Sequence, residues 1–158
     1  DESVKLENLI IEDLGDIGEE TIKLRDHYGF TRQKILQFSL DIDTLTDFDN
    51  ADKNVLMYPG NHDCPTIHGW YKSLNDECKM GLKKFLSQNH CNDINVNIGI
   101  MEYCMKCKAS MVVLTVQDII GLDDSASISP LLGFITIAQA PSALYLFITL
   151  FNSLSTAA

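Results

Sequence analysis

Residues 54–64 read NVLMYPGNHDC, and this stretch decides the fold because it joins a strand pattern to a turn pattern. Val55, Leu56 and Met57 form a short apolar run, which predicts a buried strand that ends at Tyr58. The Pro-Gly pair that follows is typical of a turn. The letters GNHD then place polar side chains just after the strand. The segment is therefore either an ordinary turn or one loop of a functional site.

The chain before this strand predicts one helix and one ambiguous segment. Residues 19–28 predict a helix with Ile22 and Leu24 facing inward, and Gly29 is placed to end it. Residues 35–42 are apolar, and their pattern fits either a short buried strand or one face of a helix.

The chain after the strand continues the alternation of helix and strand. Residues 70–86 predict a helix, because their apolar residues recur at helical spacing. Within residues 92–100 the letters INVNIGI alternate strictly between apolar and polar or small, which predicts a half-buried strand. Residues 111–116 predict another strand. This order indicates an α/β protein whose functional site lies at the ends of its strands.

Composition limits the classes of protein that fit. The chain has 158 residues, about one domain, and its 46% apolar and 22% charged content is that of a globular protein. The net charge of −10 argues against a nucleic-acid partner, because phosphate backbones require clustered Lys and Arg. Acidic residues gather in residues 1–20 and 41–52, where they form solvated surfaces or cation ligands.

Three polar loops carry residues that suit a pair of metal ions. They read GDIG at residues 15–18, LDID at 40–43 and GNHD at 60–63. Two divalent cations about 3.5–4 Å apart can clamp a phosphate ester and activate a water molecule. Such a centre needs oxygen ligands, imidazoles and a bridging carboxylate, and it receives them from several strand ends.

These motifs resemble those of the Ser/Thr phosphoprotein phosphatases, in the calcineurin-like metallophosphoesterase superfamily. GDIGEETIKLRDHYGF, ILQFSLDID and NVLMYPGNHDC follow the order of the family's GDxHG, GDxVDRG and GNHE motifs, and GNHDCPTIHGWYKSLNDECK extends the likeness. The resemblance covers about residues 8–110. It implies a metallophosphoesterase-like layered sheet flanked by helices, within an α/β domain at residues 1–128 that is truncated relative to the family.

The resemblance also implies roles for individual residues. Asp16 would bind the first metal, Asp41 would bridge both metals, and Asn61 would bind the second. His62 would be the general acid that protonates the leaving oxygen, and Asp43 would orient it. The ions would be of the Mn, Fe or Zn type, and a metal-bound water would attack the phosphate of a phosphoprotein substrate. A regulatory protein is the second kind of partner implied.

The chain departs from the family at several ligands. Ile17 leads directly to Gly18 where the family has a His, the Arg of GDxVDRG is missing, and no His follows His90. The resemblance thus implies impaired hydrolysis, and the alternative is a catalytically inactive binding module on the same scaffold. Each residue also has a purely structural interpretation: Asp16 as a helix cap, the LDID loop as a solvated turn, and His62 as a turn residue.

The five cysteines bear on location. They are Cys64, Cys78, Cys91, Cys104 and Cys107. An odd count without a visible signal peptide favours a reducing compartment, so the sequence predicts a cytoplasmic or nuclear protein. The CMKC motif at residues 104–107 is one CxxC without a second pair, which favours buried thiols over structural zinc. A disulfide-linked, membrane-tethered ectodomain is the third functional class left open.

The C-terminal segment at residues 129–158 is apolar and forms a separate unit in this interpretation. Residues 131–151 carry no charge, a length that suits a membrane helix. Residues 133–137 and 144–148 also fit two buried strands, or a strand and a helix. No Lys or Arg follows Lys108 to anchor a cytoplasmic end. Core elements, a membrane anchor and a removable GPI signal are the three alternatives.

Overall fold

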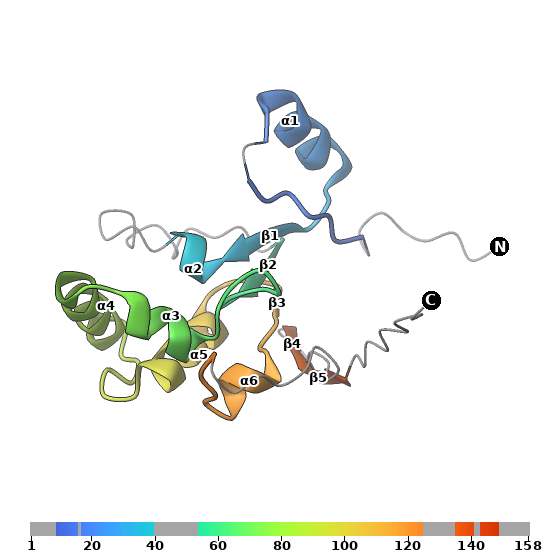
Figure 1. The fold of residues 1–158 in the computed structure, drawn as a ribbon. Coiled ribbons are helices and arrows are strands. Elements are labelled where there is room, and N and C mark those ends of the chain that lie inside the picture. The colour runs from blue at the N-terminus through green and yellow to red at the C-terminus, as the bar shows by residue number, and fades with distance from the viewer. Residues whose placement is uncertain (1–8, 16, 40–53, 125–134, 141–142, 149–158) are drawn as a thin grey trace, which may run out of the picture.

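The structure is a computed structural model that describes residues 9–15, 17–39, 54–124, 135–140 and 143–148. Figure 1 shows the arrangement of the elements. In chain order they are α1 (Glu19–Tyr28), β1 (Arg32–Ile35), α2 (Leu36–Ser39), β2 (Val55–Tyr58), α3 (Ile67–Ser73), α4 (Asp76–Gln88), α5 (Val96–Lys106), β3 (Met111–Val112), α6 (Val116–Ile119), β4 (Ile135–Ala140) and β5 (Ala143–Ile148).

A parallel sheet organises the described chain. Its strands lie in the order β1-β2-β3, and Leu56 in β2 stands opposite Gln33 on one side and Met111 on the other. An isolated parallel bridge between Ile10 and Thr31 places the segment at residues 9–13 alongside β1. The α/β class predicted from the sequence is therefore confirmed.

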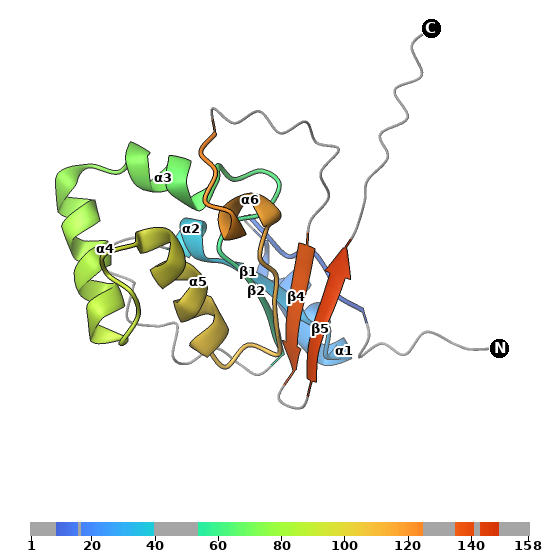
Figure 2. The same cartoon turned by 90° about the horizontal axis from the view of Figure 1, so that it is seen from below.

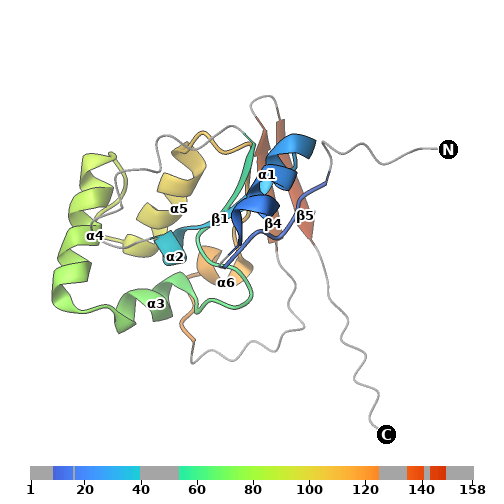
Figure 3. The same ribbon diagram turned by 90° about the horizontal axis from the view of Figure 1, so that it is seen from above.

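Helices cover one side of this sheet and hold the core. Figures 2 and 3 show α3, α4 and α5 on one side, with the β4–β5 hairpin on the other. Phe85 of α4 and Tyr103 of α5 meet edge to face with ring centroids 4.7 Å apart. The buried cluster between helices and sheet comprises Leu36, Met57, Ile67, Leu82, Phe85, Leu86, Cys91, Val96, Ile100, Tyr103, Cys104, Val112 and Leu114.

The two C-terminal strands pair with each other. β4 and β5 form an antiparallel ladder from Ile135–Ile148 to Ala140–Ala143. Both strands lie close to the two that the sequence allowed at residues 133–137 and 144–148. In the part of the chain that is described, no helix has the length and apolar character needed to cross a membrane. The predicted boundary between residues 128 and 129 lies outside the described residues.

Helix α1 confirms the predicted helix at residues 19–28. Gly29 ends it in the left-handed conformation with φ of 65°, as a C-terminal glycine should. The inward direction predicted for Leu24 is wrong, because Leu24 is 56% exposed. The buried residue of this helix is Arg25, which is drawn inward by an ion pair.

The strand predicted at residues 92–100 is wrong, because residues 96–106 form helix α5. Asn95 caps the helix by accepting a hydrogen bond from the backbone N–H of Ile98 at 3.3 Å. The residues buried along it include Val96, Ile100 and Tyr103, which repeat at helical spacing. The alternating pattern was short enough to fit both periods, and the polar Asn residues act as caps and turns rather than as the solvent face of a strand.

The remaining predictions are confirmed with shifted boundaries. The strand at the start of the opening stretch is β2, with Val55 and Met57 fully buried. The helix expected at residues 70–86 is two helices, because the Asn75 side chain caps α4 by accepting from Cys78 N at 2.7 Å. Residues 35–42 include the end of β1 and the short α2, and the strand expected at 111–116 ends at Val112.

Candidate functional site

The N-terminal described segment and β2 bring polar side chains to the sheet. Ile11 N donates to Thr31 O at 3.3 Å, and Thr31 N donates to Leu9 O at 3.4 Å, so this segment runs parallel to β1. Glu12 and Asp13 follow these bonds directly. In α/β proteins with parallel strands, the segments that follow the strands carry the functional groups.

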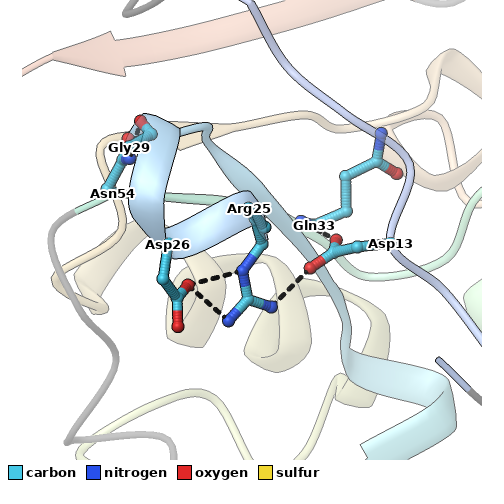
Figure 4. Close-up of polar contacts among 6 residues, drawn as sticks. All are labelled: Asp13, Arg25, Asp26, Gly29, Gln33 and Asn54. Carbon is cyan, nitrogen blue, oxygen red and sulfur yellow. Dashed lines mark hydrogen bonds and ion pairs between the residues drawn. The ribbon is translucent and has the colours of Figure 1, made fainter. Parts of the chain in front are cut away.

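Asp13 and Arg25 form a buried ion pair, which Figure 4 shows. Arg25 Nη1 lies 2.8 Å from Asp13 Oδ2, and the two side chains are 10% and 4% exposed. The other Asp13 oxygen accepts a hydrogen bond from Gln33 N at 2.8 Å. Asp26 binds the other edge of the Arg25 guanidinium: its Oδ1 lies 2.8 Å from Nε and 2.7 Å from Nη2. Burial by itself lowers the pKa of Arg25, but the bonds to Asp13 and Asp26 and their charges outweigh it and raise that pKa.

A second group of bonds ties the end of α1 to the beginning of β2. Asn54 Nδ2 donates to Gly29 O at 2.9 Å, and Thr31 Oγ1 donates to Asn54 Oδ1 at 2.7 Å. Together with the ion pair, these bonds hold the N-terminal segment, α1, β1 and β2 in one arrangement. The backbone next to Asp13 is therefore fixed from several sides.

Glu12 is the acidic residue that this arrangement leaves exposed to solvent. It is exposed, in contrast to its buried neighbour Asp13. Burial raises the pKa of Tyr58, and the negative charge of Glu12 raises it further. The Glu12 charge thus acts on the Tyr58 hydroxyl at the end of β2. The sequence interpretation passed over Glu12 in favour of Asp16, although Glu12 directly follows the apolar run at residues 9–11.

The loop after β2 is packed tightly against α2. Gln37 N donates to Pro59 O at 3.1 Å, and Gln37 Nε2 donates to Pro65 O at 3.1 Å. A Cβ atom at Gly60 would lie 2.6 Å from Gln37 Nε2 and 3.0 Å from Cys64 Cβ. The glycine of the Pro-Gly pair is thus required by close approach as well as by the turn.

The GNHD letters form a turn that exposes a histidine and an acid. Asn61 Oδ1 accepts from Asp63 N at 3.0 Å and from Cys64 Sγ at 3.2 Å, which shapes the turn. His62 Nε2 lies 3.3 Å from Asp63 Oδ2, and both side chains are more than half exposed. His62 and Asp63 therefore face solvent just beyond β2.

Two carboxylates that follow β3, Asp118 in α6 and Asp124 beyond that helix, fix the other end of this loop. Asp118, which is 2% exposed, accepts from Ile67 N at 2.7 Å and from Thr115 Oγ1 at 2.8 Å. Asp124 Oδ1 accepts from the N–H and the hydroxyl of Thr66, each at 2.9 Å. The start of α3 is thereby anchored, and with it the loop that carries His62.

Only part of the predicted metal site lies within the described residues. Asp16, Asp41 and Asp43 lie outside the described residues. Asn61 and His62 are described, and their contacts are those of the turn above. Among the residues with described positions, no three His, Cys, Asp or Glu side chains are grouped to hold a metal ion. The metal and catalytic roles of these five residues stay predictions that the structure does not test.

The cysteines all lie in the described part of the chain and are free thiols. Cys107 Sγ donates to Cys104 O at 2.9 Å, so the CxxC motif closes the end of α5. Burial raises the pKa of Cys104 well above its usual value, with the nearby Cys107 and Cys91 thiols contributing. Cys91 and Cys104 are part of the buried core, and Cys107 packs against it. They are therefore separate from the exposed Glu12.

Comparison with known proteins gives a consistent result. The model of the 4-alpha-glucanotransferase family, glycoside hydrolase family 77, matches residues 2–129. The chloroplastic/amyloplastic 4-alpha-glucanotransferase of Solanum tuberosum is 32% identical over 117 residues, which are 73% of this chain and 20% of that protein. The 4-alpha-glucanotransferase of Streptococcus pneumoniae is 30% identical over 122 residues, 75% of this chain and 24% of that protein.

A solved structure has the same fold. The amylomaltase from Streptococcus agalactiae, in complex with acarbose, aligns with a TM-score of 0.68 and 22% identity, over 76% of this chain and 24% of that one. The chain thus spans between a fifth and a quarter of the length of these relatives.

These findings correct the resemblance to the phosphoprotein phosphatases, which is wrong, as is the phosphatase function inferred from it. The mixed α/β fold is shared with amylomaltase. The GD and GNH motifs misled because Gly, Asp, Asn and His gather wherever a strand leads into a polar turn, whatever the chemistry of the protein. Their order repeated because alternating strands and helices space such turns regularly. The match over residues 2–129 shows that this chain belongs to the 4-alpha-glucanotransferase family.

Proposed function

We propose that this protein takes part in transferring 4-α-linked glucan segments from one glucan chain to another, as the names of its relatives describe. The observation that supports this most strongly is the family match over residues 2–129, which includes the two segments that present Glu12 and Asp63. Because the chain spans a fifth to a quarter of its relatives, the activity is a proposal for this chain rather than a property taken from them.

Glu12 is the proposed general acid and base. Retaining transfer needs two carboxyl groups: one attacks the anomeric carbon while the other protonates the leaving oxygen. The second group then takes a proton from the acceptor hydroxyl as that hydroxyl displaces the first carboxylate. Glu12 is exposed, and its neighbour Asp13 occupies Arg25. The guanidinium is therefore engaged away from Glu12, which leaves that carboxylate to exchange protons with a sugar.

Asp63 and His62 are proposed to bind sugar hydroxyls beside Glu12. A carboxylate accepts two hydroxyl hydrogen bonds and an imidazole can donate or accept one, which suits the neighbouring hydroxyls of a glucose ring. Both side chains are exposed and lie 3.3 Å apart. Asn61 and Gly60 support this role by shaping the turn.

We also infer that the parallel strands are an arc of a β/α barrel. The order β1-β2-β3, with the residue 9–13 segment beside β1, supports this, as does the structural likeness to amylomaltase. Barrel enzymes place their sites at the carboxyl ends of the strands, where the loop after β2 lies.

Transfer from maltotriose tests the proposed function. The intact protein should release glucose and form longer glucans, and Glu12→Gln should lower the rate by roughly 10²–10⁴-fold, the usual contribution of a general acid. Glu77→Gln, an exposed acid on α4, is the matched control and should keep the full rate. Absence of both glucose release and glucan binding would overturn the proposal.

A further inference from the structure

We propose that the buried Asp13–Arg25 pair is a positioning device that aims the Glu12 carboxylate toward the end of β2. Its catalytic meaning rests on the proposed function, but the geometry can be tested without turnover. The pair is separate from the groups that would touch a sugar, since Asp13 and Arg25 are 4% and 10% exposed.

The geometry supports positioning because both oxygens of the Asp13 carboxylate accept hydrogen bonds, which restricts the rotation of this side chain. Its Oδ1 is bound by Gln33 N and its Oδ2 by Arg25 Nη1, both at 2.8 Å. A carboxylate held through both oxygens fixes its own backbone, and Glu12 shares a peptide bond with it. One oxygen is tied to β1 and the other to α1, so the direction of the segment is set by two elements.

Arg25 is held in turn, which makes the pair rigid. Asp26 Oδ1 binds Nε and Nη2, and this leaves Nη1 directed at Asp13. A planar guanidinium can span two carboxylates in fixed directions, whereas a lysine ammonium cannot reproduce both contacts. Arg25→Lys therefore keeps the charge and removes the geometry.

The pKa of Tyr58 is the reporter for this test. It follows the Glu12 charge, so Glu12→Gln should lower it. It can be measured in the intact protein by NMR of ¹³C-labelled tyrosine, with Tyr58→Phe to assign the signal. Positioning predicts that Arg25→Met and Arg25→Lys both lower the Tyr58 pKa by at least half of the change seen in Glu12→Gln, because Glu12 turns away.

A direct charge effect gives the opposite result. Removal of the Arg25 cation would by itself raise the Tyr58 pKa, and Arg25→Lys would leave it unchanged. Positioning also predicts that Arg25→Lys has no lowering effect in a Glu12→Gln background. Lys23→Met, which removes an exposed cation from α1, is the matched control and should leave Tyr58 unchanged. An unchanged or raised pKa in folded Arg25→Lys would overturn the inference.

The experiments distinguish a failure of the proposed function from a failure of this inference. If Glu12→Gln abolishes transfer while Arg25→Lys alters neither kcat nor the Tyr58 pKa, positioning is wrong and the function stands. If the Tyr58 pKa falls as predicted but maltotriose is neither bound nor converted, the geometry stands and the function is wrong. If both hold, Arg25→Lys should lower kcat at least tenfold with little change in KM.

Discussion

Arg25 Nη1 lies 2.8 Å from Asp13 Oδ2, and this pair is buried although it joins a segment and a helix at the outer part of the described sheet. The contact explains why α1 buries a cation instead of Leu24. It also makes the stability of this region depend on Arg25, since the buried Asp13 carboxylate would have no cation beside it without that side chain.

Removal of one partner should therefore be costly. Arg25→Met should lower the free energy of unfolding by about 3–5 kcal/mol, because it leaves the buried Asp13 carboxylate without a cation. Asp13→Ala should cost less, because Asp26 still pairs with the Arg25 guanidinium. The double variant should lose less than the sum of the two, with a coupling of about 1 kcal/mol or more. Urea unfolding of the four proteins measures this cycle, and strictly additive losses would show that the two side chains do not interact.

Gly99 should tolerate no side chain. A Cβ atom there would meet the carbonyl oxygen of Asn92, which is backbone and cannot rotate away. Gly99→Ala should lower the free energy of unfolding by about 1–3 kcal/mol, the usual cost of overpacking, even though alanine favours helices. If thermal or urea unfolding showed Gly99→Ala to be more stable than the natural chain, the placement of α5 against residue 92 would be incorrect.

Asp118 should give the protein a specific dependence on pH. Burial raises the pKa of Asp118, while its bonds from Ile67 N and Thr115 lower it in part, and the net change is upward. Between the unfolded and the native pKa, the native state keeps a proton that the unfolded chain has released. The stabilising contribution is thus complete below about pH 3.9 and is lost as pH rises through the native pKa.

Asp118→Asn removes this titration and keeps an acceptor for Ile67 N. The difference in unfolding free energy between the natural protein and Asp118→Asn should therefore decrease between about pH 3.5 and pH 7. Urea unfolding at both pH values measures it. A difference that grows toward neutral pH would contradict the assignment of Asp118 as a carboxyl with a raised pKa.

Cys104 should resist alkylation until the protein unfolds. It is fully buried, and burial raises its pKa well above the usual value, so little reactive thiolate forms near neutral pH. Cys78 on α4 is partly exposed and should react first. Peptide mapping after iodoacetamide treatment gives the order, and equal rates for Cys78 and Cys104 would contradict the described core.

Local signals in the sequence predicted the parts of the fold that local physics controls. Gly29 ended α1 because a left-handed residue favours glycine, and the apolar run at Val55 became the buried strand β2. The strand predicted at residues 92–100 is wrong because seven residues can fit the period of a strand and that of a helix. Capping by Asn95 and the burial of Tyr103 favour the helix.

The site was harder to predict because its decisive contacts are distant in sequence. Nothing local marks Asp13 as the partner of Arg25, twelve positions later, or Asp118 as the acceptor for Ile67, 51 positions earlier. The GNHD turn was correctly singled out as following a strand. The phosphatase function attached to it is wrong, since turn residues alone do not determine the chemistry of a protein.

The most direct test of the glucan-site proposal is an NMR titration of the intact protein with acarbose, the ligand in the related amylomaltase structure. We expect the largest shifts on the backbone signals of Glu12, His62 and Asp63, and weaker binding by Asp63→Asn. Shifts confined to other surfaces, or none at millimolar acarbose, would contradict a glucan site at this edge of the sheet.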